Sequence, residues 1–261
     1  MSDEPSATRS IDIEITIDAP VEAVWEALSK GDGLEQWFSP EARVNPGVGG
    51  SIWLSWGEGV SGEGRIEVWE PNRRLVWSEP LGGKAAPLLV DFELEAKGGT
   101  TRLRMVHSGF GASADWDEQY DATKAGWTYF LFHLAFYLVR HRGRIRRMVS
   151  ARRKTARPVA AVWKDLLGSD GLGVADSRQG SRHAMRLGGV QAGQVEISRP
   201  PHNFAGTLTS LNDGLVFVEM EMGTPEWHCG VWVSVYDLPD DTADLLQSAL
   251  DEVMDAHFPE V

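Results

Sequence analysis

The sequence is poor in cysteine. Its single cysteine, Cys229, cannot form an intramolecular disulfide and excludes any zinc site built from several cysteines. The surrounding segment "EWHCGVWVSVY" has the character of a strand, which predicts a buried thiol. The seven histidines are scattered, and no pair has the i, i+4 spacing around an acid that marks a helical metal site. We therefore expect no metal site.

Signals for membranes and nucleotides are also missing. The nearly apolar run at 126–139 contains His133 and falls short of the roughly 18 residues that a membrane-spanning helix requires. The start, "MSDEPSATRS", has no basic segment followed by an apolar one, so we expect a cytoplasmic protein without membrane insertion. No Walker-type loop occurs, and "GVGG" at 47–50 is better explained as a turn. We expect no cofactor.

The charge is unevenly distributed. Net charge is −13, yet nine of the 25 basic residues lie between Arg140 and Arg157, where there is no acid. A nucleic-acid site would combine such a cluster with a reading module or interleaved aromatic residues, and neither is present. Cations suit the end of a helix, and a basic segment between acidic domains can pair with both. We expect no nucleic-acid partner.

Three segments of the sequence return in the same order. "PVEAVWEAL" at 20–28 returns as "PVAAVWKDL" at 158–166, and "DGL" at 32–34 returns at 170–172, both at an offset of 138. "GRIEVWEPNRRL" from Gly64 matches "GQVEISRPPHNF" from Gly193 at an offset of 129. Such self-similarity predicts two tandem copies of one domain. The change of offset means that the second copy has lost nine residues.

We predict domains at 10–147 and 148–261, the second shortened, diverged and missing the segment that corresponds to Trp37–Val48. Most of the loss falls on "EQWFSPEARVNPGVG". The basic stretch 148–157 coincides with the place where the first strand of the second copy should lie. We expect that strand to be missing or badly diverged.

Periodicity gives the order of elements in the first copy. Isoleucines alternate with polar residues over 11–17, which predicts a half-buried strand. A helix follows from Pro20 to the glycines at 31 and 33, and a long helix capped by Asp115 or Asp117 includes 126–139. Between the helices we predict strands at 51–56, 64–70, 74–79, 88–96 and 101–108. The fold class is α+β: a curved antiparallel sheet gripping a long C-terminal helix, duplicated in tandem.

Six segments spread over most of 11–139 carry a family resemblance: "IDAPVEAVWEAL", "LEQWFSPEARV", "GVGGSIWLSW", "GRIEVWEPNRRLVWS", "TTRLRMVHSGFG" and "GWTYFLFHLAFYL". In these segments the sequence resembles the START/SRPBCC superfamily, the helix-grip fold, and within it the C-terminal domain of the heat-shock ATPase activators. The resemblance implies a deep cavity between sheet and long helix, which in relatives holds lipids, polyketides or other apolar molecules. One fold of this kind hosts many activities.

Aromatic residues are concentrated in the first copy, so we expect its cavity to be the binding site. His107 alternates with Leu103 and Met105 and would face the cavity as a polar anchor, although a hydrogen-bonded core histidine is an alternative. No carboxylate or serine completes a triad with it, so no catalytic residue is assigned. The predicted ligand-binding residues are Trp37, Phe38, Trp53, Trp77, Phe92, His107, Trp127, Phe130 and Leu134.

The predicted function is non-catalytic binding of an apolar or aromatic small molecule, lipid-like or polyketide-like. The alternatives are an enzyme of the cyclase or hydrolase type acting on such a ligand, and a chaperone-associated cofactor. In the activators that the sequence resembles, a separate N-terminal domain helps to engage the chaperone. We do not expect the ten residues before the first predicted strand to supply such a domain, which weakens the chaperone alternative.

The long helix carries aromatic residues on two sides. One stripe contains Trp127, Phe130 and Leu134, and Tyr129 and Phe136 belong to the other. An exposed second stripe would be a larger apolar patch than monomers usually tolerate. We expect the second domain, or a second subunit in a homodimer, to cover it.

Overall fold

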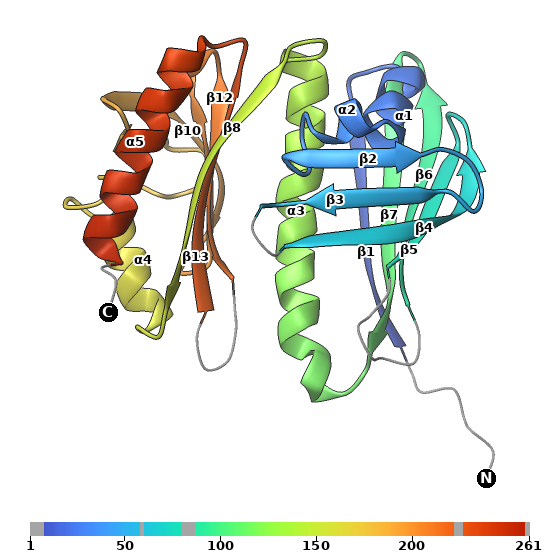
Figure 1. Cartoon of the computed structure of the whole chain (residues 1–261), viewed down its shortest axis with the longest axis horizontal. Helices are drawn as coiled ribbons and strands as arrows, with labels where there is room; N and C mark the ends of the chain where they lie inside the picture. The colour runs from blue at the N-terminus through green and yellow to red at the C-terminus, as the bar shows by residue number, and fades with distance from the viewer. Residues whose placement is uncertain (1–7, 58–59, 80–86, 222–226, 259–261) are drawn as a thin grey trace. The chain divides into compact units, whose positions relative to one another are not determined.

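The alternating isoleucines form the first strand of the computed structural model, which describes residues 8–57, 60–79, 87–221 and 227–258. Contacts divide the chain into two compact units, residues 1–142 and 143–261. Each unit contains one antiparallel sheet and a long C-terminal helix (Figure 1). The predicted fold class is therefore confirmed.

The first unit contains a seven-stranded sheet with the order β1-β7-β6-β5-β4-β3-β2. The long helix α3 lies along this sheet (Figure 1). The elements in chain order are β1 (Thr8–Ile17), α1 (Val21–Ser29), α2 (Gly31–Leu34), β2 (Glu41–Asn45), β3 (Ser51–Ser55), β4 (Ser61–Glu70), β5 (Arg74–Glu79), β6 (Leu88–Lys97), β7 (Thr100–Gly111), a 3₁₀ turn (Ala114–Trp116) and α3 (Asp117–Arg140).

The second unit repeats this topology with one strand fewer. Its sheet has the order β8-β13-β12-β11-β10-β9. Among its described residues, no strand corresponds to β2, which lies inside the segment predicted to be missing. The elements are β8 (Arg146–Thr155), α4 (Val159–Leu167), β9 (Arg182–Arg186), β10 (Val190–Arg199), β11 (Asn203–Leu208), a 3₁₀ turn (Thr209–Leu211), β12 (Gly214–Glu221), β13 (Trp227–Tyr236) and α5 (Asp240–His257).

The repeated motifs occupy equivalent positions in the two units. Pro20 and Pro158 each precede the first helix in an extended conformation. A Cβ on Gly33 would lie 2.3 Å from the carbonyl oxygen of Glu26, and one on Gly171 would lie 2.2 Å from that of Leu166. Both distances are shorter than any real contact, so the chain can pass this close to its first helix only at a glycine.

The basic segment forms β8, so the first strand of the second unit is diverged and not missing. Antiparallel pairing with β13 runs from Arg146 to Thr155. Only Val149 and Ala151 of this strand face the core of the unit. Arginines occupy other positions, and they are neutralised within the unit by acids. The ion pairs are Arg147 with Asp240, Arg152 with Glu221, and Arg153 with Asp251 and Asp255.

The core of the second unit lies between its sheet and the helices α4 and α5. Cys229 is fully buried there as a free thiol. Burial, with the nearby Glu219 and Glu221, raises the pKa of this thiol to about 12. The predicted buried cysteine is therefore in place, and its thiolate is not accessible at neutral pH.

The first turn of α3 is fixed to the sheet by polar contacts. Arg9 of β1 pairs with Asp117 at 2.6 Å, and its guanidinium lies over the ring of Tyr120. The Tyr120 hydroxyl donates to the carbonyl oxygen of Ser10 at 3.1 Å. These contacts set where the helix begins its path along the sheet. No described helix of either unit has the length and apolar character needed to cross a membrane.

If α5 is the gripped helix of the second unit, truncating its buried face should be costly. Leu250 is fully buried and Leu245 is 69% exposed on the same helix. We expect Leu250→Ala to lower the free energy of unfolding by about 2–5 kcal/mol, because it leaves a cavity. Leu245→Ala should change it by less than about 0.5 kcal/mol. Chemical denaturation measures both, and equal effects would contradict the assigned face of α5.

Candidate ligand-binding site

An aromatic cluster fills the space between α3 and the first sheet. Phe38 stacks on Trp37 and on Trp127 with ring centroids 5.0 and 5.3 Å apart, and meets Phe130 edge-on at 4.7 Å. The indole N–H of Trp37 donates to the carbonyl oxygen of Ala27 at 2.9 Å. Trp37 and Phe38 directly follow the short helix α2. This segment therefore brings two aromatic rings to the face of α3 that carries Trp127 and Phe130.

A hydrogen bond joins the cluster to the sheet. The indole N–H of Trp127 donates to Nδ1 of His107 at 2.9 Å. His107 is 4% exposed, and Phe110 lies against its ring at 4.8 Å. Because Nδ1 accepts, Nε2 carries the proton, and Nε2 has no hydrogen-bond partner among the described residues. Burial lowers the pKa of His107 to about 4, so the ring is neutral at pH 7.

A pocket of about 400 Å³ opens beside this cluster, at the β3, β4 and β5 end of the sheet. We call it the indole pocket, because two indole rings contribute to its wall. Its lining residues are Ile52, Leu54, Trp56, Val60, Ser61, Gly62, Glu63, Gly64, Trp77 and Glu79. The volume lies within the range of small-molecule sites.

The absence of a side chain at Gly64 gives the indole of Trp77 its position. A Cβ on Gly64 would lie 2.7 Å from Cδ1 of Trp77, so the ring rests directly on the backbone of β4. The same glycine is one of the repeated positions of the sequence. In the second unit, a Cβ on Gly193 would lie 1.7 Å from the carbonyl oxygen of Thr207. Both copies therefore require glycine here, but only the first places an indole over it.

Glu79 brings a carboxyl group to the indole pocket. Leu75, Trp77 and Glu79 alternate along β5, so the carboxyl belongs to the same sheet face as the buried leucine and indole. Trp77 donates its indole N–H to Oε1 of Glu79 at 3.3 Å. Burial raises the pKa of the Glu79 carboxyl, and the hydrogen bond from Trp77 opposes this effect only in part. Among the described residues, the charged form of Glu79 is therefore compensated only in part.

Two ring contacts connect the indole pocket with the aromatic cluster. Trp56 meets Phe38 edge-on at 5.4 Å, and Trp77 lies 5.4 Å from Phe92. Phe92 in turn contacts Trp127 at 5.7 Å. Of the predicted binding residues, Trp77 lines the pocket directly, while Trp37, Phe38, Phe92, His107, Trp127 and Phe130 belong to the connected cluster. Leu134 is fully buried on α3.

Trp53 lies apart from the other predicted residues. Ile52 and Leu54 are buried on the inner face of β3, so Trp53 between them points to the other face. There the guanidinium of Arg43 lies 4.5 Å from its ring centroid. The prediction gave weight to aromatic character and overlooked the alternation of the strand.

Of the ten described residues that line the indole pocket, only Trp77 was predicted from the sequence, and Trp56 and Glu79 are the most informative of the others. Trp56 follows the end of β3, where alternation no longer indicates a direction. Glu79 stands two residues after Trp77 on β5, so alternation places an acid on an apolar face. An acid at such a position is itself a signal of a functional site.

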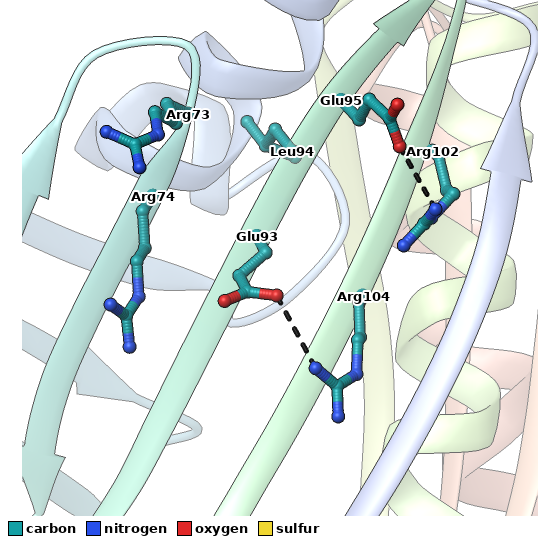
Figure 2. Close-up of a pocket in the computed structure, with 7 residues that line it drawn as sticks. All are labelled: Arg73, Arg74, Glu93, Leu94, Glu95, Arg102 and Arg104. Carbon is teal, nitrogen blue, oxygen red and sulfur yellow. Dashed lines mark ion pairs between the residues drawn. The ribbon is translucent and has the colours of Figure 1, made fainter.

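A second pocket, of about 270 Å³, lies on the outer face of the first sheet. Its lining residues are Arg73, Arg74, Glu93, Leu94, Glu95, Arg102 and Arg104. Figure 2 shows Glu95 pairing with Arg102, at 3.0 Å, and Glu93 with Arg104, at 3.5 Å. Arg104 also makes two hydrogen bonds to Asp12, which lower the pKa of that carboxyl. These charges neutralise one another across the strands, as is common on a solvated face.

The described residues contain no group of three or more histidine, cysteine, aspartate or glutamate side chains that could hold a metal ion.

The neutral state of His107 predicts a pH-dependent stability. The unfolded chain takes up the proton near pH 6.5, whereas the folded protein takes it up only near pH 4. The contribution of neutral His107 to the free energy of unfolding is therefore fully present above pH 6.5. It is lost, by about 3 kcal/mol, as the pH falls towards 4. His107→Gln keeps an acceptor for Trp127 but cannot titrate. We expect thermal unfolding of this variant to depend less on pH over that window than unfolding of the wild type, and identical profiles would contradict the assignment.

Comparison with known proteins places the first unit in a family. Residues 18–138 match the model of the family described as Activator of Hsp90 ATPase homolog 1-like protein. No curated protein gives a match.

Among solved structures, protein MLL2253 from Mesorhizobium loti is 28% identical, with a TM-score of 0.45, over 51% of this chain and 98% of that one. CalU16 from Micromonospora echinospora is 30% identical, with a TM-score of 0.41, over 50% and 74%. DynU16, a protein in the dynemicin biosynthetic locus, is 19% identical, with a TM-score of 0.44, over 94% and 95%.

The match to this family model confirms the resemblance to the helix-grip superfamily. Residues 18–138, which contain the indole pocket and most of the aromatic cluster, belong to the Activator of Hsp90 ATPase homolog 1-like family.

Proposed function

We propose that the first unit binds an apolar or aromatic small molecule in the indole pocket. The observation that carries this proposal is the juxtaposition of Trp56 and Trp77 with aliphatic residues in a cavity of about 400 Å³. Small-molecule sites are concave, mostly apolar and equipped with few polar groups. The indole pocket has this composition.

The aromatic cluster behind the pocket supports the same role. Phe38 and Phe92 contact the two pocket indoles from inside. A ligand ring placed against Trp56 or Trp77 would extend a network in which edge-to-face and stacked pairs are already favourable. The predicted binding residues therefore act mostly as the wall that holds the pocket indoles in position.

Binding without catalysis agrees best with the chemistry of the lining. No histidine, cysteine or lysine is among the ten described residues around the indole pocket. His107, the residue predicted to anchor a ligand, uses Nδ1 to accept from Trp127. A general base in the pocket would have to be a carboxylate, and no serine is hydrogen-bonded to Glu79 in the described part of the chain. Retention of a ligand requires none of these groups.

Replacement of one indole at a time tests the site. With 2-naphthylmethanol as the probe, we expect Trp77→Leu to weaken binding roughly tenfold, because ring contact and buried apolar area are both lost. Trp53→Leu is the matched control, since Trp53 lies on the outer face against Arg43, and it should leave affinity within about twofold. Isothermal titration calorimetry gives both values. Equal losses in the two variants, or no saturable binding to the wild type, would refute the proposed site.

A further inference from the structure

We propose that the indole pocket selects ligands that carry a protonated amine, and that the Glu79 carboxylate is the residue that makes this selection. The inference rests on the proposed function and adds the chemical class of the ligand. It follows from three features of the pocket: the sign of its charges, the position of Glu79, and the two indoles.

The charged side chains among the described lining residues of the indole pocket have one sign. They are Glu63 and Glu79, and the other eight described lining residues are uncharged. This differs from the pocket on the outer face, where arginines and acids alternate and pair. The described lining thus carries acidic groups and no base, and acidic groups in a cavity favour a cation over a neutral or anionic guest.

Glu79 is the better placed of the two acids. The side chain of Glu63 belongs to an exposed position of β4, whereas Glu79 is partly buried at the end of β5. The Glu79 carboxyl accepts a hydrogen bond from the neutral indole N–H of Trp77. It forms no ion pair with any described residue. A carboxylate that is removed from water without a counterion gains from a cation that enters its pocket.

The burial of this carboxyl supports the same reading. Burial raises the pKa of Glu79, and the hydrogen bond from Trp77 opposes this rise only in part. A bound ammonium group would supply a positive charge and keep the carboxylate ionised. The ligand would thereby add an ion pair that the described residues do not give Glu79.

The indoles add to this preference. Trp56 and Trp77 line the same cavity as the carboxylate. The face of a tryptophan ring is the strongest aromatic partner for a cation. The expected ligand therefore has an apolar or aromatic body that packs on the indoles and a primary or secondary amine that reaches Glu79.

Three probes of nearly equal shape test the inference. They are 2-naphthylmethylamine, 2-naphthylmethanol and 2-naphthoic acid, titrated calorimetrically into the full chain at pH 7.5. We expect the amine to bind about tenfold more tightly than the alcohol, because its hydrogen bond is charge-assisted, and the acid to bind most weakly. In Glu79→Gln the amine and the alcohol should bind within twofold of each other. Glu63→Gln is the control and should keep the tenfold preference.

The outcomes separate this inference from the proposed function. If the alcohol binds but the amine is no tighter, the amine selection is wrong and the apolar site stands. If the preference survives Glu79→Gln, Glu79 is not the residue that makes the selection, and the inference is refuted at that point. If none of the three probes binds, the proposed function fails and the inference with it. The comparison of probes on the wild-type chain holds even if Glu79→Gln does not fold.

Discussion

The hydrogen bond from Trp127 to His107 joins the long helix to the sheet at a point where both are buried. A ring nitrogen that accepts this bond must be unprotonated, and burial keeps it so by lowering the pKa of His107 to about 4. Trp127 also contacts Phe92 of β6 and Phe38 after α2. The helix thus covers β6 and β7, and the indole pocket lies further along the sheet, at β3, β4 and β5.

The two units share a topology but differ in their interiors. Their sheets have the same strand order, except that the described residues of the second unit contain no counterpart of β2. The segment that holds β2 in the first unit also supplies Trp37 and Phe38, the rings that lie on α3. The core of the second unit consists largely of valine, leucine and methionine side chains. In the first unit, this segment therefore supplies the rings that connect the helix with the pocket.

Alternation and repetition predicted most of the fold, because both are properties of single elements. The isoleucines of β1, the paired "PVxAVW" helices and the glycine hairpin between β6 and β7 were all found in place. The strand β2 was not predicted, because only Ala42 and Val44 of its five residues point inward. The strand β8 was doubted, because its two core residues stand among arginines and give a weak apolar pattern. The pocket was harder to predict. The direction of the Trp56 side chain depends on a loop, because the residue lies after the end of β3. The role of Glu79 depends on the pairing of β3, β4 and β5, which together form the pocket.

The central claim is that a ligand enters the indole pocket, and the indole N–H signals of the tryptophans can report it residue by residue in an NMR titration with 2-naphthylmethylamine. The account predicts that the signals of Trp56 and Trp77 shift with a common binding curve. The signal of Trp53 on the outer face, and those of Trp163, Trp227 and Trp232 in the second unit, should stay in place. Shifts confined to Trp53 or to the second unit, with Trp56 and Trp77 unchanged, would contradict it.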